Sequence, residues 1–367
     1  MSALPAVSER FAKLVGANRI ALLTALGRDV RTAARAKSRR QNNELVYSPS
    51  DLNTFLDNEC VTWLSRFNLE YPGELTANEA AEEDVLIQGA GDEHERSCLA
   101  GLISSGADVA VIDRDDPYAF LVTFEAMRTG PEIICQARLD LNEFKGWADF
   151  LFRVDGASEL GSWHYEVWDT KLSRSMKPYF AVQLCCYTEM LEAIQGKRPT
   201  EMGIILGNGA RQALRVADYW FYYQPLRQAF LEQQRLFDRE SVPPFPGLGD
   251  YRQWSRHISQ LLSSRDDLSL VANIRTSQIE KLTAAGITSA TMLVVADRGA
   301  VSAINPATFE RLRAQARLQA ASEPGQPPAC EHMPPPADGM RQGFVLLPPA
   351  SPSDVCFDIE GYPLGQP

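Results

Sequence analysis

The most constraining feature of this sequence is a pair of β-like segments, FKGWADFLFRV (144–154) and HYEVWDTKL (164–172), that lie close together in the chain. Each segment alternates or runs apolar in the manner of a strand in a sheet. The gap between them allows a hairpin, with residues 153–164 as its turn region. We expect the two strands to be antiparallel and to lie at the centre of the sheet.

Other segments surround this hairpin with an alternation of expected strands and helices. The strongest helix is predicted at 177–196, where Gly196 closes an apolar periodic run. The expected fold is therefore α/β: a mixed central β-sheet flanked by helices, followed by a C-terminal helical region and a Pro-rich tail. Further strands are expected at 107–113, 120–130, 132–139, 201–209 and 218–224, and further helices at 48–64, 87–106 and 225–240.

Composition divides the chain into five segments. Residues 1–43 hold nine Lys or Arg against two acidic residues, which predicts a basic helical leader, either a solvated surface helix or a phosphate-contacting arm. A helical hairpin is expected at 267–296, hinged at Gly286, for packing or for DNA contact. Eleven of the 23 prolines fall in residues 321–367, which marks a linker. The expected boundaries are 1–44 for the leader, 45–240 for the α/β domain, 241–320 for the helical region, 321–350 for the linker and 351–367 for an incomplete first strand of another domain.

The net charge of the chain is −11, from 36 Lys and Arg against 47 Asp and Glu. This balance argues against a surface coated with basic residues for nucleic acid, but it leaves a local basic groove open. No apolar run approaches the ~20 residues of a membrane-spanning helix, and Glu9 and Arg10 interrupt the N-terminus where a signal peptide needs an apolar stretch. The seven cysteines are scattered and odd in number, so we expect a reducing, cytoplasmic setting. They form no Cys-x-x-Cys pair, so we expect no structural zinc site.

Three residues of the hairpin are candidates for chemistry. Asp169 and Lys171 share one face of their strand because side chains alternate with period two, and the hairpin brings Asp149 beside them. Two carboxylates on adjoining strands suit a hard cation such as Mg²⁺ or Mn²⁺. The lysine can orient a water or stabilise charge on a phosphoryl oxygen. The pattern indicates phosphodiester hydrolysis, although Asp-x-Lys by itself is also common in surface strands.

Two neighbouring helices add polar residues to this set. Gln183 and Tyr187 are four residues apart and so share one face of the helix that follows the hairpin. Upstream, His94 offers an imidazole on the helix expected at 87–106 as a further ligand. Taken singly, His94 also fits a structural histidine, and Gln183 and Tyr187 also fit polar residues that flank a packed helix.

In this order the motifs resemble the RecB-like nucleases of the PD-(D/E)XK superfamily. That family has a Gly-x-x-x-His helix, a Gly-x-x-Asp strand, an (Asp/Glu)-x-Lys strand and a Gln-x-x-x-Tyr helix. The corresponding segments are Gly-Asp-Glu-His94, in which the glycine stands three residues before the histidine instead of four, Gly146-Trp-Ala-Asp149, Asp169-Thr-Lys171 and Gln183-Leu-Cys-Cys-Tyr187. The resemblance covers about residues 45–240 and implies a restriction-endonuclease-like core. It implies metal ligands at His94, Asp149, Asp169 and the Thr170 backbone carbonyl, a catalytic Lys171, and substrate-side or positioning roles for Gln183 and Tyr187.

Two further comparisons with this family concern the cysteines and the C-terminus. Some RecB-type nucleases hold an iron–sulfur cluster with one cysteine upstream of the core and three downstream. Cys60 matches the upstream position, but residues 200–320 contain no cysteine, so we expect no iron–sulfur cluster and a buried apolar role for Cys60.

Residues 343–364 resemble the start of a ribonuclease H-like DEDD exonuclease domain, with Asp358 and Glu360 on one strand face. In larger relatives this plan continues into that domain and a helicase.

The leading hypothesis is a metal-dependent nuclease that hydrolyses DNA phosphodiester bonds, in DNA repair, recombination or nucleic-acid processing. Its expected cofactor is Mg²⁺ or Mn²⁺. Its expected partners are single- or double-stranded DNA and a helicase domain or protein, with no membrane. One alternative is a non-catalytic nucleic-acid-binding module that retains a nuclease scaffold. Another is a metal-dependent enzyme that acts on a small phosphorylated substrate.

Overall fold

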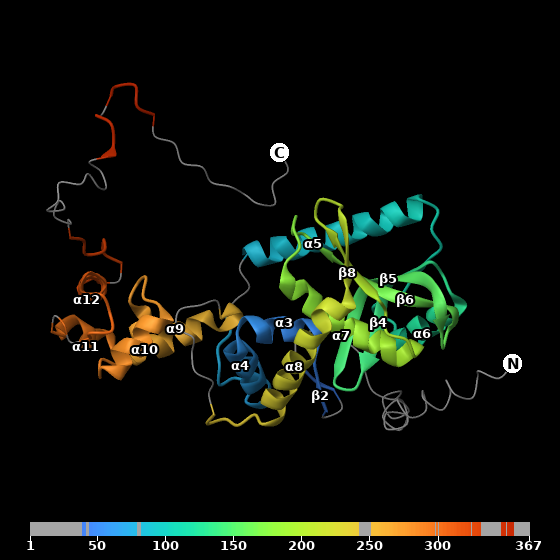
Figure 1. Cartoon of the computed structure of the whole chain (residues 1–367), viewed down its shortest axis with the longest axis horizontal. Helices are drawn as coiled ribbons and strands as arrows, with labels where there is room; N and C mark the ends of the chain where they lie inside the picture. Colours follow the sequence, from blue (N-terminus) through green and yellow to red (C-terminus); the bar gives the residue numbers. More distant parts are fainter. Residues whose placement is uncertain are drawn as a thin grey trace. The chain divides into compact units, whose positions relative to one another are not determined.

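The computed structural model describes residues 39–41, 44–78, 82–241, 251–297, 299, 301–323, 325–331, 346–349 and 351–355. The chain divides into a larger unit (Met1–Pro244 and Tyr251–Trp254) and a smaller unit (Phe245–Asp250 and Ser255–Pro367) (Figure 1). Most of the expected leader, much of the expected linker and the segment with Asp358 and Glu360 lie outside the described residues.

A six-stranded mixed sheet in the larger unit confirms the expected α/β fold. The strand order is β3-β4-β5-β6-β7-β8. The β4–β5, β5–β6 and β7–β8 pairs are antiparallel, whereas β3–β4 and β6–β7 are parallel. The β5–β6 hairpin is central, as its spacing predicted. The strands span Val109–Val111 (β3), Ile133–Leu141 (β4), Phe144–Ser158 (β5), Gly161–Lys171 (β6), Glu201–Leu206 (β7) and Arg211–Arg215 (β8). A separate ladder joins β1 (Arg39–Gln41) to β2 (Glu44–Val46).

Helices cover both faces of the sheet (Figure 1). On one face, Phe150 and Ile205 are buried together with Leu102 of α5 (Glu82–Ser104). On the other face, Val167 lies in the main core with Leu184 of α7 (Pro178–Gln195). Apolar residues of three more helices line this same core, and α4 packs on α3. These helices are α3 (Pro49–Asp57), α4 (Glu59–Glu70), α6 (Ala119–Thr129) and α8 (Val216–Arg235).

The strand expected at 120–130 is wrong, because this segment forms α6. Its buried residues Ala119, Thr123 and Met127 recur every four positions, which matches the period of a helix and not that of a strand. Gly130 ends the helix in the left-handed conformation, with a φ of 81°. A run of β-branched and aromatic residues concealed this helical spacing in the sequence.

The strand expected at 218–224 is also wrong, because these aromatic residues belong to α8. The helix buries Val216, Trp220 and Tyr223 at helical spacing and continues through Pro225. The helix expected at 48–64 is instead two helices, α3 and α4, separated by Asn58. The extended backbone of Asn58 breaks the run, and its side-chain oxygen accepts the N–H of Cys60 at the start of α4 (3.0 Å).

The hairpin itself is longer than expected. Strand β5 continues to Ser158 and β6 begins at Gly161, so most of the predicted turn region at 153–164 is strand. By contrast, the helix predicted at 177–196 is confirmed as α7, and Gly196 ends it with a φ of 67°.

The smaller unit contains the expected helical hairpin. Helices α10 and α11 are joined at Gly286, whose φ of 83° is left-handed, and Leu282, Leu293 and Phe309 form part of its core. Contact of this hairpin with DNA stays a prediction. The helices are α9 (Ser255–Ser264), α10 (Thr276–Ala284), α11 (Ala290–Val295) and α12 (Pro306–Ala320), and short 3-10 turns lie at η1 (Arg252–Trp254, in the larger unit) and η2 (Leu268–Leu270).

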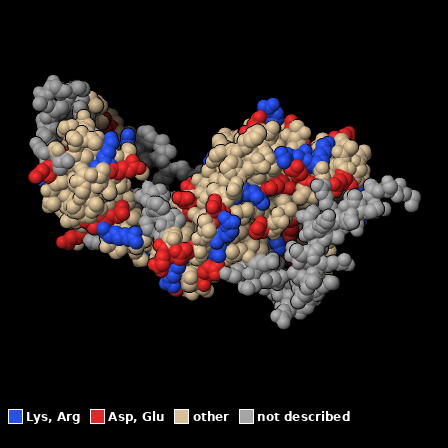
Figure 2. Space-filling model, turned by 60° about the horizontal axis from the view of Figure 1, so that its bottom comes forward, with Lys and Arg blue, Asp and Glu red and all other residues tan. Residues whose placement is uncertain are grey.

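Acidic and basic side chains are interspersed over the described part of the face shown in Figure 2. The described residues form no broad basic surface on this face, so an electrostatic preference for a phosphate backbone here would come from local groups. Among the helices that the structure describes, none is long and apolar enough to cross a lipid bilayer.

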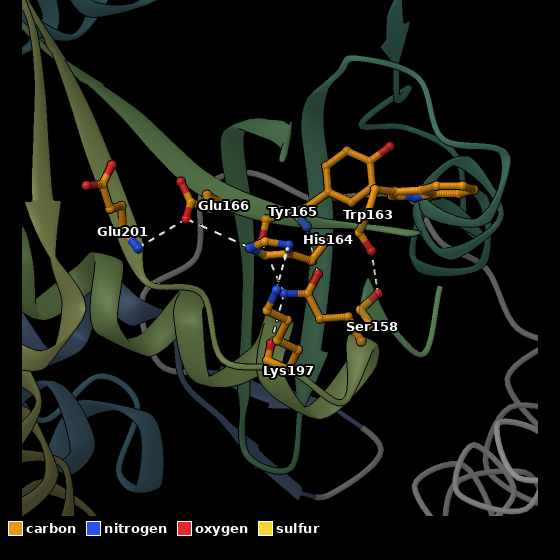
Figure 3. Close-up of polar contacts among 8 residues, drawn as sticks. Ser158, Trp163, His164, Tyr165, Glu166, Lys197 and Glu201 are labelled. Carbon is orange, nitrogen blue, oxygen red and sulfur yellow. Dashed lines mark hydrogen bonds and ion pairs between the residues drawn. The ribbon is translucent and has the colours of Figure 1, made fainter. Parts of the chain in front are cut away.

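A buried polar cluster joins the first half of β6 to the residues that follow α7 (Figure 3). The Lys197 Nζ atom lies 3.3 Å from Nδ1 of His164, and Nε2 of His164 lies 4.0 Å from Oε1 of Glu166. The same Glu166 oxygen accepts the backbone N–H of Glu201 (3.1 Å). Burial, and then the charge of Lys197, lower the pKa of His164 below its ordinary value of 6.5. Burial raises the pKa of Glu166 above 4.5.

This cluster makes folding stability depend on pH. Because the folded protein resists protonation of His164, the unfolded chain binds that proton first, and stability is lost as the pH falls below about 6.5. Glu166 acts in the opposite direction, since its raised pKa favours proton uptake by the folded state.

We expect His164→Gln to reduce the loss of unfolding free energy between about pH 7.5 and about pH 5.5, measured by urea titration. His257→Gln, a histidine of the smaller unit, is the control. An unchanged pH dependence in His164→Gln would contradict this assignment.

Candidate functional site

The two candidate carboxylates lie where strands β5 and β6 separate. The last residue pair of this ladder is Phe150 with Trp168, while β6 continues to pair with β7 as far as Lys171. Asp149 lies just beyond the last pair. Its Oδ2 atom accepts the backbone N–H of Thr170 (2.8 Å) and the Thr170 hydroxyl (2.7 Å). The carboxylate of Asp149 therefore occupies the fork between the strands, beside Asp169.

Lys171 is held as a cation next to Asp169. Its Nζ atom lies 2.5 Å from Oδ2 of Asp169 and 3.4 Å from Oε1 of Gln183. Burial by itself would lower the pKa of Lys171, but the carboxylates of Asp169 and Asp149 outweigh it and raise that pKa above its ordinary value. The lysine therefore supplies a fixed positive charge and is poorly suited to act as a general base.

The two carboxylates are unfavourable neighbours when both are ionised. Burial, followed by the charge of Asp169 and then that of Glu95, raises the pKa of Asp149 well above its ordinary value. Oδ2 of Asp169 is fully buried, and the ammonium group of Lys171 lies in contact with it. A pair of crowded, buried carboxylates is the environment that a bound cation would stabilise.

The donor set fits Mg²⁺ better than zinc. Within the described residues, no group of three or more His, Cys, Asp or Glu side chains is placed to hold a metal ion. Structural zinc sites need four protein ligands, and catalytic ones need three. Mg²⁺ usually keeps several waters and is held by one or two carboxylates together with substrate phosphate. Asp149 and Asp169 supply that number of carboxylates.

His94 lies on α5, and its ring approaches strand β7. Its Nε2 atom is 3.4 Å from the carbonyl oxygen of Ile205 and 3.9 Å from Sγ of Cys98. The structure does not bring His94 into a three-residue group with the two aspartates, and its role as a metal ligand stays a prediction. The next residue, Glu95, is electrostatically coupled to Asp149 and was missed in the sequence. Its place beside His94 in the polar run at 92–96 was the available signal.

Gln183 and Tyr187 have distinct positions on α7. Gln183 faces Lys171, whereas Tyr187 contacts β5, the strand that bears Asp149. The Tyr187 hydroxyl donates to the backbone carbonyl of Trp147 (2.7 Å). A Cβ atom at Gly146 would lie 2.7 Å from the Tyr187 ring. The geometry therefore favours a positioning role for Tyr187, and it explains why glycine at 146 accompanies tyrosine at 187.

Comparison of the sequence with known protein families and with curated proteins gave no match. The resemblance to RecB-like nucleases therefore depends on the motif residues alone and stays a prediction.

The contact between Gly146 and Tyr187 can be tested by adding one methyl group. We expect Gly146→Ala to destabilise the protein by about 1–3 kcal/mol, because the new Cβ would meet the Tyr187 ring and Pro49 in a packed core. Urea or thermal unfolding measures the effect. Gly101→Ala is the matched control: its Cβ would meet nothing within 4 Å, and alanine favours the helix there. Equal effects of the two substitutions would refute the contact.

The repulsion between the carboxylates also has a measurable consequence. We expect Asp149→Asn to raise the melting temperature in EDTA by a few degrees, as about 1 kcal/mol of relieved repulsion would do in a unit of this size. The same substitution should remove most of the stabilisation that added Mg²⁺ or Mn²⁺ gives the wild type. Asp155→Asn, an exposed position on the same strand, should change neither quantity. Loss of stability in EDTA, or an intact metal response, would count against a shared carboxylate site.

Proposed function

We propose that this protein is a Mg²⁺-dependent nuclease that hydrolyses DNA phosphodiester bonds. The observation that carries the proposal is the fork between β5 and β6, where the carboxylates of Asp149 and Asp169 lie beside the ammonium group of Lys171. Roles in DNA repair or recombination, a cytoplasmic location and a helicase partner follow only from the sequence and its resemblance, and they belong to this proposal.

The chain's own residues can supply the parts that phosphodiester hydrolysis needs. Asp149 and Asp169 would hold the divalent cation, which activates water and neutralises charge on the phosphoryl group when it is bound. Lys171 contributes a second, permanent positive charge at the same place, kept in position by Asp169 and Gln183. Thr170 orients Asp149 through two hydrogen bonds. Tyr187 fixes the strand that carries Asp149.

The charges near the fork favour an anionic substrate although the whole chain carries −11. Residues 170–188 contain Lys171, Arg174 and Lys177 and no Asp or Glu. Arg174 and Lys177 are exposed, and they lie in the loop that leads from Lys171 into α7. This local excess of positive charge supports a phosphate-containing polymer as substrate.

Cleavage of labelled single- and double-stranded DNA by the purified chain tests the proposal. We expect the wild type to cleave only with Mg²⁺ or Mn²⁺, and Lys171→Ala to lower kcat by about 10²–10³-fold, the usual loss when one preorganised electrostatic group is removed. Lys281→Ala, an exposed lysine of the smaller unit, is the matched control and should retain activity.

The same assay separates the alternatives. Equal inactivity of wild type and Lys171→Ala with both metals would overturn the nuclease proposal. DNA binding that persists in an inactive wild type and in Asp149→Asn would support a non-catalytic binding module. Competition by mononucleotides as strong as that by oligonucleotides would support a small phosphorylated substrate.

A further inference from the structure

Gln136 has an unusual backbone conformation in the middle of β4. Its φ is 56°, in the left-handed region that side chains other than glycine rarely adopt. The other non-glycine residues of the described chain with positive φ lie outside the strands. Such a conformation costs on the order of 1–3 kcal/mol and tends to occur at functional sites. Glycine would adopt it without strain, so the glutamine side chain needs an explanation of its own.

The register places Gln136 in the same row as the two carboxylates. On β4 and β5, Cys135 pairs with Phe150 and Ala137 with Ala148, which sets Gln136 opposite Asp149. By the same reasoning, the pairing of Phe150 with Trp168 sets Asp149 opposite Asp169. Three polar residues thus follow one another across three adjacent strands of the sheet.

At the row that contains Gln136 and Asp149, the side chains of β4 and β5 also change the face of the sheet on which they pack. On β4, Cys135 belongs to the core under α5, whereas Ala137 and Leu139 belong to the core under α7. On β5, Phe150 belongs to the α5 side and Ala148 to the α7 side. Regular alternation would keep residues two apart on one face. The left-handed residue interrupts that alternation next to Asp149.

The Gln136 side chain holds an arginine at this position. Its Oε1 atom accepts a hydrogen bond from Nε of Arg114, an exposed residue in the loop between β3 and α6. The Arg114 guanidinium lies over the ring of Trp147, 5.7 Å from its centroid, and Trp147 is two residues from Asp149 on β5. The Cys135 thiol is within electrostatic reach of both Arg114 and Asp149.

No carboxylate of the described residues forms an ion pair with Arg114, although acidic residues flank it in the loop. The Asp113 Oδ1 atom accepts the backbone N–H of Asp115 (2.9 Å), and Oδ1 of Asp116 accepts that of Tyr118 (2.7 Å). These carboxylates therefore stabilise the turn before α6. With Nε engaged by Gln136, the two terminal nitrogens of Arg114 keep the planar fork that suits a phosphate group.

We propose that Arg114 binds a phosphate of the nucleic-acid strand at the Asp149–Asp169 site, and that Gln136 is the residue that positions it. The inference rests on the proposed nuclease function. The Arg114 contact would lie beside Gln136, at the opposite end of the Gln136–Asp149–Asp169 row from Lys171. Positive side chains would therefore contact the nucleic-acid strand on both sides of the two carboxylates. The side chain of Gln136 gives this strained position a role that glycine could not fill, because its Oε1 atom accepts the Arg114 Nε–H.

A double-mutant cycle tests the pair, with KM and kcat measured on an oligonucleotide in Mg²⁺. Arg114→Ala and Gln136→Gly should each raise KM on the order of tenfold with a smaller change in kcat, as expected for loss of a charge-assisted phosphate contact. The double variant should be no worse than either single variant, because the two residues act as one unit. Gln136→Gly should not lower the melting temperature, since glycine relieves the backbone strain.

The matched control is Arg138→Ala, which removes the same charge from the same aromatic neighbour. Arg138 also lies against Trp147, 5.4 Å from the ring centroid, but its Nε atom is paired with Asp140 (2.6 Å). The Arg138→Ala variant should leave KM unchanged. Equal effects of Arg114→Ala and Arg138→Ala on KM, or additive effects of the Gln136 and Arg114 substitutions, would overturn the inference.

Binding measured by fluorescence anisotropy in Ca²⁺ separates this inference from the nuclease proposal. If the wild type binds the oligonucleotide in Ca²⁺ but does not cleave it in Mg²⁺ or Mn²⁺, and both single variants weaken binding alike, the phosphate contact is supported and the nuclease proposal fails. If the wild type cleaves DNA and neither variant alters KM or affinity, the nuclease proposal stands and the inference about Arg114 fails.

Discussion

The closeness of two carboxylates at the point where β5 and β6 part is the interaction on which the proposed site depends. Asp149 and Asp169 would repel each other if both were ionised in this buried place, and the raised pKa of Asp149 expresses that cost. The protein offsets part of it locally, with two donors from Thr170 and the ammonium group of Lys171. The repulsion that remains would be relieved by a proton on Asp149 or by a bound cation.

The elements around the fork mainly fix the positions of the ends of β5 and β6 relative to each other. Helix α7 does so at two points: Gln183 meets Lys171, and Tyr187 binds the backbone of Trp147 above Gly146. Beyond the far end of α7, Lys197 joins the helix to His164 on the same strand as Asp169 (Figure 3). Strand β6 is therefore fastened to one helix along most of its length, and small displacements of the carboxylates are resisted from both ends.

Patterns with one clear period were interpreted correctly from the sequence. The hairpin and α7 were predicted because alternation in the first and an i, i+4 repeat closed by glycine in the second leave little choice of structure. The segments at 120–130 and 218–224 were mistaken for strands because short runs of aromatic and β-branched residues fit both periods. Their helical form follows from which side chains meet the core, and that information lies in distant parts of the chain.

The sequence by itself determined the α/β fold, the central hairpin and the shared strand face of Asp169 and Lys171, because these follow from periods of two and 3.6 residues. It also singled out Asp149 as a third member of the group. Only the tertiary structure decided that Tyr187 supports a strand, that Glu95 acts on Asp149, and that Gln136 lies in the same row with a left-handed backbone. Each of these depends on contacts between residues far apart in the chain, which local periodicity does not encode.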